Sequence, residues 1–172
     1  MASQRNNQLL FRESQALTQW WIWLIVLGIA ALQWYAFYQQ IIRGEPFGDN
    51  PAPDGLLIVF WILFGIGLPV LFFAARLKTE VRADAVYVQY VPFHLRPVVI
   101  RPAEIISASA GQYSPWADYG GWGIRYGAGG KAYNASGNRG VRLELAAGKH
   151  LLIGSQHAPA LAAAINQLLN NQ

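Results

Sequence analysis

The sequence predicts a membrane α-hairpin joined to a small α+β soluble domain, and three observations lead to this fold class. The stretch from Gly55 to Ala75 carries no charge and is long enough to cross a bilayer. A second charge-free run precedes it and has aromatic residues at both ends. After residue 78 the apolar pattern changes to period two, and after Pro159 it changes to the period of a helix.

The composition supports membrane placement and excludes several kinds of site. Charged residues make up 13% of the chain, whereas soluble domains usually carry about 25%. The sequence has no cysteine, which excludes disulfides and cysteine-ligated metals. The formal charge of +4 is spread along the chain and does not indicate nucleic-acid binding. About 95 residues follow the second apolar run, enough for one small core.

The first predicted transmembrane helix covers residues 20–42. Its apolar core from Trp20 to Tyr38 would be about 28 Å long as a helix, close to the hydrocarbon thickness of a bilayer. Tryptophan and tyrosine gather at both ends of this core, which is typical of a spanning helix. Gln33 is its one polar residue. It either forms a hydrogen bond to another helix or is hydrated near the interface.

The second predicted transmembrane helix covers residues 55–77 and is interrupted by Gly65, Gly67 and Pro69. Pro69 removes one helical hydrogen bond and is expected to kink the helix. We expect the two glycines to let the helices of the hairpin approach closely. An unwound ion site is disfavoured, because no ionisable residue accompanies the interruption.

Basic residues predict the orientation of this hairpin. The basic residues on its two outer flanks are Arg5, Arg12, Arg76, Lys78 and Arg82, and the short loop of residues 43–54 has only Arg43 beside three acidic residues. The positive-inside rule therefore predicts that both termini are cytoplasmic and that the loop is external. Residues 1–19 are then a cytoplasmic N-terminal segment, and residues 78–172 are a cytoplasmic domain.

The cytoplasmic domain is predicted to hold about seven short antiparallel strands and one helix. The clearest alternation is in residues 85–91 and 140–146. The other candidate strands are residues 79–81, 98–101, 105–110, 122–126, 131–135 and 150–153. A glycine-rich turn at residues 127–130 suggests a hairpin. Leu161, Ile165, Leu168 and Leu169 form the apolar stripe of an amphipathic helix that starts near Pro159.

These elements resemble the bacterial pleckstrin-homology-like (PH-like) family over residues 78–170. The stretches that carry the resemblance are KTEVRADAVYVQY, RPAEIISA, YGGWGIRY and VRLELAAGKHLLIGSQHAPALAAAI. The whole layout is similar to uncharacterised two-span bacterial membrane proteins. The resemblance implies a bent antiparallel sheet or barrel with the C-terminal helix at one end. It also implies a binding or assembly module at the bacterial inner (plasma) membrane.

The sequence nominates no catalytic, cofactor-binding or metal-binding residue. The run from Gly127 to Lys131 invites a phosphate-loop interpretation, but Arg125 and Ala132 occupy positions where the motif needs Gly and Ser or Thr. The three histidines show no metal-ligand spacing. The acidic residues are too scattered for an acid–base pair. We therefore predict no enzymatic activity and no cofactor.

The stretch of residues 112–142 is the best candidate for a partner or lipid surface. The candidate residues are Trp116, Tyr119, Arg125, Lys131, Arg139 and Arg142. Trp116 and Tyr119 are expected to be exposed, whereas Trp122 and Ile124 are expected in the core. One hypothesis is protein–protein interaction or assembly at the membrane. The other is recognition of anionic lipid headgroups by the basic residues. A third interpretation is that the aromatic residues are core and the arginines lie on strand exteriors.

Overall fold

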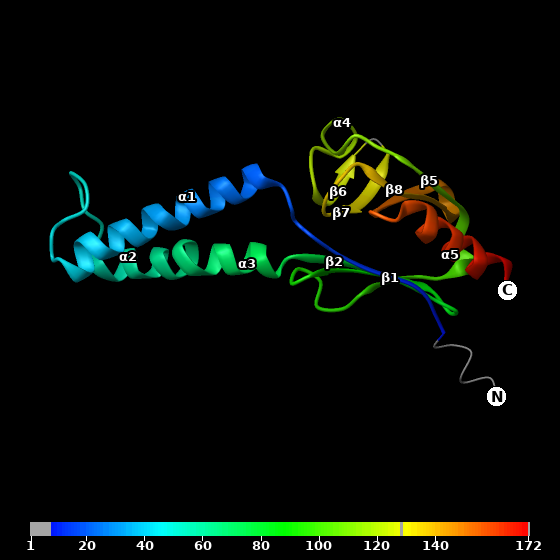
Figure 1. The fold of residues 1–172 in the computed structure, drawn as a ribbon, viewed down its shortest axis with the longest axis horizontal. Helices are drawn as coiled ribbons and strands as arrows, with labels where there is room; N and C mark the ends of the chain where they lie inside the picture. Colours follow the sequence, from blue (N-terminus) through cyan, green and yellow to red (C-terminus); the bar gives the residue numbers. More distant parts are fainter. Residues whose placement is uncertain (1–7, 128, 172) are drawn as a thin grey trace. The chain divides into compact units, whose positions relative to one another are not determined.

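The computed structural model describes residues 8–127 and 129–171, and it divides into two compact units (Figure 1). The first unit is Gln19–Ala74, and the second combines the described residues before Gln19 with those after Ala74. The first unit is helical. The second holds a four-stranded sheet, a five-stranded sheet and a C-terminal helix. The protein is therefore an α+β fold with two apolar helices, as predicted at the level of fold class.

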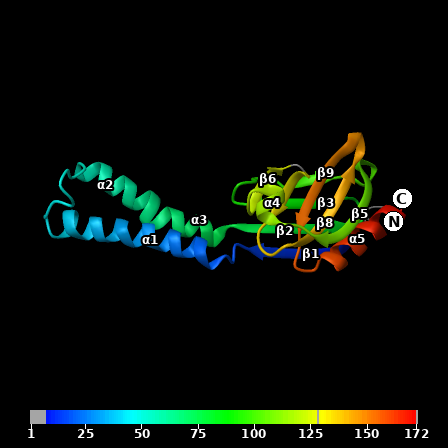
Figure 2. The same ribbon diagram turned by 90° about the horizontal axis from the view of Figure 1, so that it is seen from above.

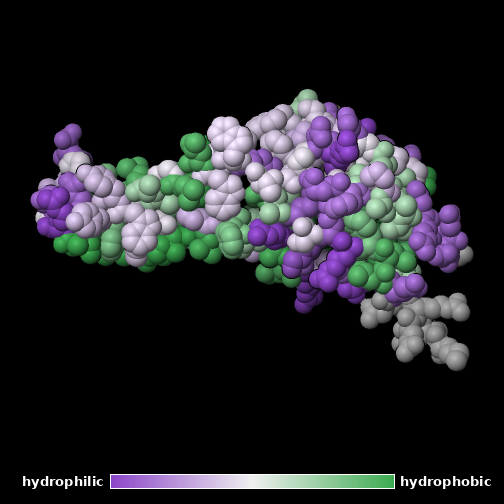
Figure 3. All heavy atoms as spheres, in the orientation of Figure 1, coloured by the Kyte–Doolittle hydropathy of each residue, from purple (hydrophilic) through white to green (hydrophobic). Residues whose placement is uncertain are grey.

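The helical unit contains two continuous helices. The first is α1 (Trp20–Phe37), extended by the π-helical η2 (Tyr38–Ile42). The second runs through α2 (Asp54–Phe60), the π-helical η3 (Trp61–Gly67) and α3 (Leu68–Ala74). Both are long and apolar enough to cross a membrane, and only 17% and 11% of their most apolar windows are buried. Figure 3 shows many of these hydrophobic residues at the surface of this unit. The second helix ends at Ala74, earlier than the predicted residue 77.

Gly65 is the point of close approach between the two helices. A Cβ atom on Gly65 would lie 3.4 Å from the Cβ atom of Gln33 and 3.0 Å from the ring of Trp61. The expectation that a glycine allows close packing is confirmed at this position, and Gln33 lies half-buried against it. Gly67 differs, because a Cβ atom there would meet the carbonyl oxygen of Ile62 in its own helix.

The second helix is π-helical in the segment η3, just before Pro69, where the sequence predicted an interruption. This segment ends at Gly67, two residues before the proline. Pro69 has no N–H group, so the carbonyl of Gly65 lacks its usual α-helical donor. The indole Nε1 of Trp34 donates to this oxygen at 3.2 Å from the other helix. Where the surroundings are apolar, such a bond satisfies a group that water cannot reach.

Replacing Trp34 by phenylalanine should therefore weaken the helical unit. The change removes the donor to Gly65 and alters the edge-on contact with Trp61, whose ring centroid lies 5.0 Å away. We expect a loss of about 1 to 2 kcal/mol in the free energy of unfolding, measured by denaturant titration in detergent micelles. Trp20→Phe is the matched control, since Trp20 is 75% exposed at the start of α1. Equal midpoints for both variants would contradict the prediction.

The four-stranded sheet has the order β1-β2-β3-β4, and each neighbouring pair is antiparallel. Its strands are β1 (Leu9–Ala16), β2 (Arg76–Arg82), β3 (Val86–Val91) and β4 (Val98–Ile100). In β3 the side chains of Val86, Val88 and Tyr90 are buried and the alternate residues are half-buried. This confirms the predicted alternation.

The five-stranded sheet has the order β5-β8-β9-β7-β6. Its strands are β5 (Ile105–Gln112), β6 (Gly123–Gly127), β7 (Gly130–Asn134), β8 (Arg139–Leu145) and β9 (Lys149–Gly154). Strands β7 and β9 pair in parallel, so the prediction of antiparallel strands alone is wrong. Nine strands are present among the described residues, more than the predicted seven. Residue 128, in the predicted turn, lies outside the described part of the chain.

Strand β1 corrects the prediction for the N-terminal segment. Residues 1–19 were predicted as a segment separate from the domain of residues 78–172, yet β1 extends the first sheet of that domain through its pairing with β2. Gln15 is buried, and its Nε2 donates to the carbonyl of Gly154 at 2.7 Å. The predicted flank residue Arg5 lies outside the described residues.

The core of the second unit lies among both sheets and the C-terminal helix α5 (Ala158–Asn170). The predicted apolar stripe of α5 is buried at Leu161, Ile165 and Leu168. The helix contacts β5 and β8 of one sheet and β1 and β2 of the other (Figure 2). The remaining short elements are the 3-10 turns η4 (Pro102–Glu104) and η5 (Ala146–Gly148) and the helix α4 (Pro115–Tyr119).

Candidate functional site

The candidate surface is built around α4, a single helical turn that the sequence prediction missed. Ser114 is its N-cap, and the Ser114 hydroxyl accepts a hydrogen bond from the backbone N–H of Ala117 at 3.2 Å. The backbone N–H of Ser114 donates in return to Asp118 at 2.9 Å. Pro115 occupies the first turn, and Gly120 ends the helix with a φ of 69°. Ser-Pro followed by an acidic residue and then glycine is a helix-start and helix-stop signal that could have revealed α4.

Tyr119 is buried, so the expectation that it is exposed was wrong. Its side chain packs with Tyr113, Ala132 and Leu152 in a small apolar cluster. The rings of Tyr113 and Tyr119 meet edge-on at 6.0 Å. The small side chain of Ala132 leaves room on the sheet for an aromatic ring. Tyr119 therefore anchors α4 to the five-stranded sheet and does not offer a ligand surface.

Trp116, Trp122 and Arg125 form what we call the aromatic–arginine cluster. Trp116 is 59% exposed, and its ring meets that of Trp122 edge-on at 5.8 Å. Arg125 donates from Nε to the carbonyl oxygen of Trp122 at 2.9 Å. A Cβ atom at Gly121 would lie 3.7 Å from both Trp116 and the Arg125 guanidinium. Trp122 is half-buried against Trp116 and belongs to neither core cluster, so its predicted core position is wrong. Ile124 packs against the main core, as predicted.

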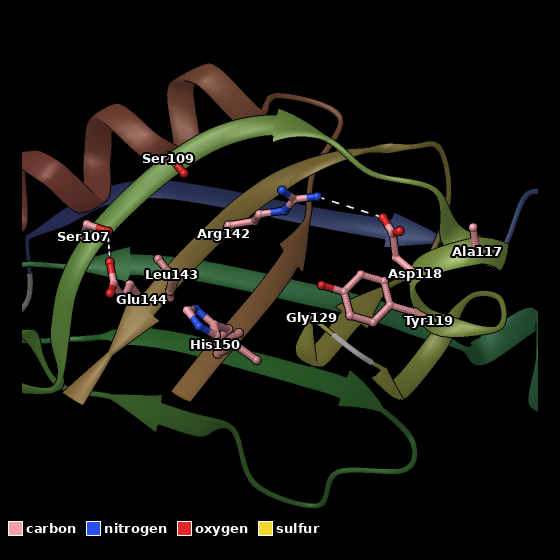
Figure 4. A pocket seen from close by; sticks show the side chains of 11 residues that line it. Ser107, Ser109, Ala117, Asp118, Tyr119, Gly129, Arg142, Leu143, Glu144 and His150 are labelled. Atoms are coloured by element: carbon pink, nitrogen blue, oxygen red, sulfur yellow. Dashed lines mark hydrogen bonds and ion pairs between the residues drawn. The ribbon is translucent and has the colours of Figure 1, made fainter. Parts of the chain in front are cut away.

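Arg142 lies in a polar hollow of about 550 Å³ beside α4 (Figure 4). Figure 4 shows its guanidinium pointing toward Asp118, and the two are 4.0 Å apart. The guanidinium also donates to the carbonyl of Gln112 at 3.4 Å. On the neighbouring strand Ser107 donates to Glu144 at 3.2 Å. The positive charge of Arg142 is therefore balanced by a carboxylate of the same hollow.

Lys131 lies on the face of the five-stranded sheet opposite to the one that carries Arg125. Ala132 pairs with Arg125, and Lys131 with Tyr126, so Lys131 and Arg125 project from opposite faces. The Lys131 ammonium lies over the rings of Tyr126 and Tyr133, at 5.4 and 4.7 Å. Burial lowers the pKa of Lys131, but the neighbouring phenols raise it by more, so its pKa is raised and the group stays charged.

A groove of about 670 Å³ adjoins Lys131. The residues that line it include Val98, Ile100, Tyr126, Tyr133, Leu145 and Lys149. Arg139, the first residue of β8, is exposed and pairs with Gln112. The structure thus brings Trp116, Arg125 and Arg142 to the side of α4, but it does not gather all six predicted residues on one surface.

Glu13, Ser155 and His157 lie together and superficially resemble a catalytic group. The Ser155 hydroxyl donates to Glu13 at 2.5 Å and accepts from the backbone N–H of His157 at 3.0 Å. The His157 Nδ1 lies 3.5 Å from Glu13. The serine hydroxyl donates to the carboxylate and not to the imidazole, so the three groups do not have the serine–histidine–acid order of a catalytic triad. The group instead ties β1 to the start of α5, where His157 is the N-cap.

The glycine-rich connection between β6 and β7 is a packing device. A Cβ atom at Gly127 would overlap the carbonyl oxygen of Asp118, and one at Gly129 would lie 2.9 Å from the Tyr119 hydroxyl. The connection joins two strands, whereas a phosphate loop leads from a strand into a helix. Among the residues that the structure describes, no group of three His, Cys, Asp or Glu side chains could hold a metal ion.

The sequence matches a protein family over residues 2–170, which include both the helical unit and the α+β unit. The chain belongs to this family. It is described as a family of unknown function, DUF6141. No curated protein matches the chain. The DUF6141 match extends through the apolar helices and the sheets alike, so the two units are parts of one family architecture.

Proposed function

We propose that this protein is a non-enzymatic module of the bacterial inner membrane that docks a protein partner through the aromatic–arginine cluster. The observation that carries the proposal is the exposed Trp116, held edge-on by Trp122 beside the guanidinium of Arg125. Tryptophan and arginine are the residue types most enriched at the energetic centres of protein interfaces. Trp116 lies on the capped helical turn α4 and Arg125 on strand β6, so regular structure holds both in a fixed arrangement.

Membrane anchoring by the two helices has support within the sheet. Strand β1 precedes the first helix and β2 follows the second, yet the two strands are paired from Leu9 to Ala16. Paired strands must lie on the same side of a membrane. If the two apolar helices that connect β1 to β2 span the membrane, they therefore cross it in opposite directions as a hairpin. The basic flanks Arg12, Arg76 and Lys78 favour the cytoplasm for that side.

A PH-like fold for the α+β unit is the structural part of the proposal. Two sheets share one core with a C-terminal helix, which agrees with the expected bent sheet closed by a helix. The parallel pairing of β7 with β9 departs from the expected antiparallel order. The α+β class stands without this assignment.

Protein docking is favoured over lipid-headgroup recognition by the distribution of charge. Lys131 lies on the sheet face opposite Arg125, and Arg142 lies 4.0 Å from Asp118. A headgroup site would be expected to gather several cations on one surface. The aromatic–arginine cluster needs no such gathering.

Photocrosslinking in native membranes tests the proposal. A photoreactive phenylalanine in place of Ala117, an exposed residue next to Trp116 on α4, should give adducts with a partner or a second copy of the chain, resolved by mass spectrometry. The matched control is position 126, since Tyr126 is 75% exposed and lies on the opposite sheet face. We expect Trp116→Ala to reduce recovery of the partner about 30-fold, as removal of about 2 kcal/mol predicts.

Two results would contradict this function. One is recovery of monomer alone when the photoreactive residue at position 117 lies beside an intact Trp116. The other is a combination of findings. The protein binds anionic liposomes, raised salt abolishes this binding and Arg125→Gln weakens it, whereas Trp116→Ala leaves partner recovery unchanged. The second result would favour the lipid hypothesis.

A further inference from the structure

The connection between β3 and β4, residues 92–97, displays two large apolar side chains to solvent. Leu95 is 94% exposed and Phe93 is 56% exposed. Arg96 beside them is also exposed. Isolated apolar residues are common on protein surfaces, but two on one short loop tip next to a cation form an amphipathic projection. Neither the predicted partner surface nor the aromatic–arginine cluster includes this loop.

His94 holds the loop in a defined conformation. Its backbone N–H donates to the carbonyl of Tyr90 at 2.8 Å, and its Nδ1 accepts from the backbone N–H of Tyr90 at 3.3 Å. Its carbonyl accepts from the Gln89 side chain at 3.0 Å. The imidazole ring meets Tyr133 edge-on at 5.6 Å. With His94 turned toward the protein, Leu95 is left in solvent, and Phe93 keeps one side against the Tyr90 ring, 5.9 Å away between centroids, while more than half of its side chain stays exposed.

The imidazole of His94 is held neutral in this position. Burial lowers its pKa from the ordinary value, and the charge of Lys131 on β7 lowers it further. A neutral imidazole keeps its acceptor for the Tyr90 N–H, so the loop stays tied to β3 at neutral pH.

Strand register places this loop at the end of the sheet from which the apolar helices continue. Ala16 pairs with Arg76, and Arg76 pairs with Val91. Only Ala75 separates Arg76 from the last residue of α3, Ala74. Cross-strand neighbours lie about 5 Å apart, so Val91 lies about 5 Å from Arg76, which is two residues after Ala74 in the chain. The loop begins at the next residue.

We propose that residues 92–97 insert Phe93 and Leu95 into the lipid interface of the leaflet at which α3 ends, with Arg96 at the phosphate level. This proposal rests on the membrane anchoring proposed above. The partner is the bilayer itself, because the chain already approaches it at Arg76 and because an apolar tip with a flanking cation complements the headgroup–acyl boundary. The domain would then be held to the membrane at the loop in addition to the two helices.

The absence of cysteine from the chain allows a direct test with single-cysteine variants of the full protein. Leu95→Cys, Ala83→Cys and Leu63→Cys would each carry an environment-sensitive fluorophore, in vesicles of phosphatidylcholine and phosphatidylglycerol. Ala83 is exposed in the turn at the opposite end of the same sheet, roughly 20 Å away along the strand. Leu63 is exposed on η3 and reports on the membrane anchor. Spin-labelled lipid and aqueous iodide serve as the two quenchers.

The proposal predicts that spin-labelled lipid quenches the label at position 95 roughly twofold or more over position 83, with iodide giving the reverse order. Three results would overturn it. In the first, position 95 behaves like position 83 while lipid quenches position 63, so the anchor stands and the loop inference fails. In the second, position 63 is aqueous as well, so the anchoring itself fails. In the third, neither quencher reaches position 95, so protein covers the loop.

Discussion

Replacing Gly130 by alanine is expected to destabilise the α+β unit by about 3 kcal/mol or more. Gly130 begins β7 and has a φ of 94°, a conformation that L side chains rarely adopt. A Cβ atom there would also overlap the carbonyl oxygen of His150 on β9. The neighbour is backbone of the parallel partner strand, so relief would require β7 to move from β9. Denaturant titration followed by tryptophan fluorescence measures the loss.

Gly148→Ala is the matched control for this prediction. Gly148 also has a positive φ, of 67°, but a Cβ atom there would meet no other atom within 4 Å. It should therefore show only the backbone cost, about 1 kcal/mol. The difference between the two variants measures the contact with His150. If both variants lose the same stability, the close approach of β7 to β9 is not what requires glycine at position 130.

Replacing Glu13 by alanine should detach β1 from the start of α5. The Glu13 carboxylate accepts from the Ser155 hydroxyl at 2.5 Å and from the backbone N–H of Gln156 at 2.9 Å. Its loss leaves the Ser155 hydroxyl without this acceptor in a buried position. We expect a loss of about 2 to 3 kcal/mol, since hydrogen bonds to charged groups contribute more than neutral ones. Hydrogen exchange of the β1 amides measures the detachment.

Two further variants separate the hydrogen bonds from the charge. Glu13→Gln keeps one oxygen acceptor and should lose less stability than Glu13→Ala. Arg12→Ala removes an exposed ion pair, 3.3 Å from Glu80, and should cost no more than about 1 kcal/mol. The explanation fails if Arg12→Ala accelerates exchange in β1 as much as Glu13→Ala does.

The strands that sequence reasoning found are those whose buried side chains are apolar. In β3 the residues Val86, Val88 and Tyr90 alternate with half-buried residues, so the period of two was visible. In β1 the two inward positions Glu13 and Gln15 are polar, because their partners are the turn and carbonyls that precede α5. Leu10 and Phe11 of β1 do pack against the core, but they are adjacent in sequence and give no period of two, and the polar positions that follow them hide the strand. The hydrogen-bonding partners of these polar positions are more than a hundred residues distant in the chain.

The candidate site was predictable in residue type but not in arrangement. Trp116 and Arg125 were expected at a surface and are found together beside Trp122. Tyr119 was misplaced because α4 is only one turn long, too short for a hydrophobic period to show which side is buried. The separation of Lys131 from Arg125 follows from hairpin register, which a shift of one residue would reverse. The loop carrying Leu95 was missed because exposure of an apolar side chain has no local sequence signal.

The pairing of β1 with β2 also determines when the first sheet can fold during translation. Translation reaches Ala16 about sixty residues before its partner Arg76, a delay of roughly 3 to 12 s at ordinary elongation rates. During that interval β1 has no β2 to pair with, and its polar residues Glu13 and Gln15 make the waiting strand a poor template for aggregation. The first sheet can close only after both apolar helices have been synthesised. A nascent chain that stops within the hairpin therefore cannot complete this domain.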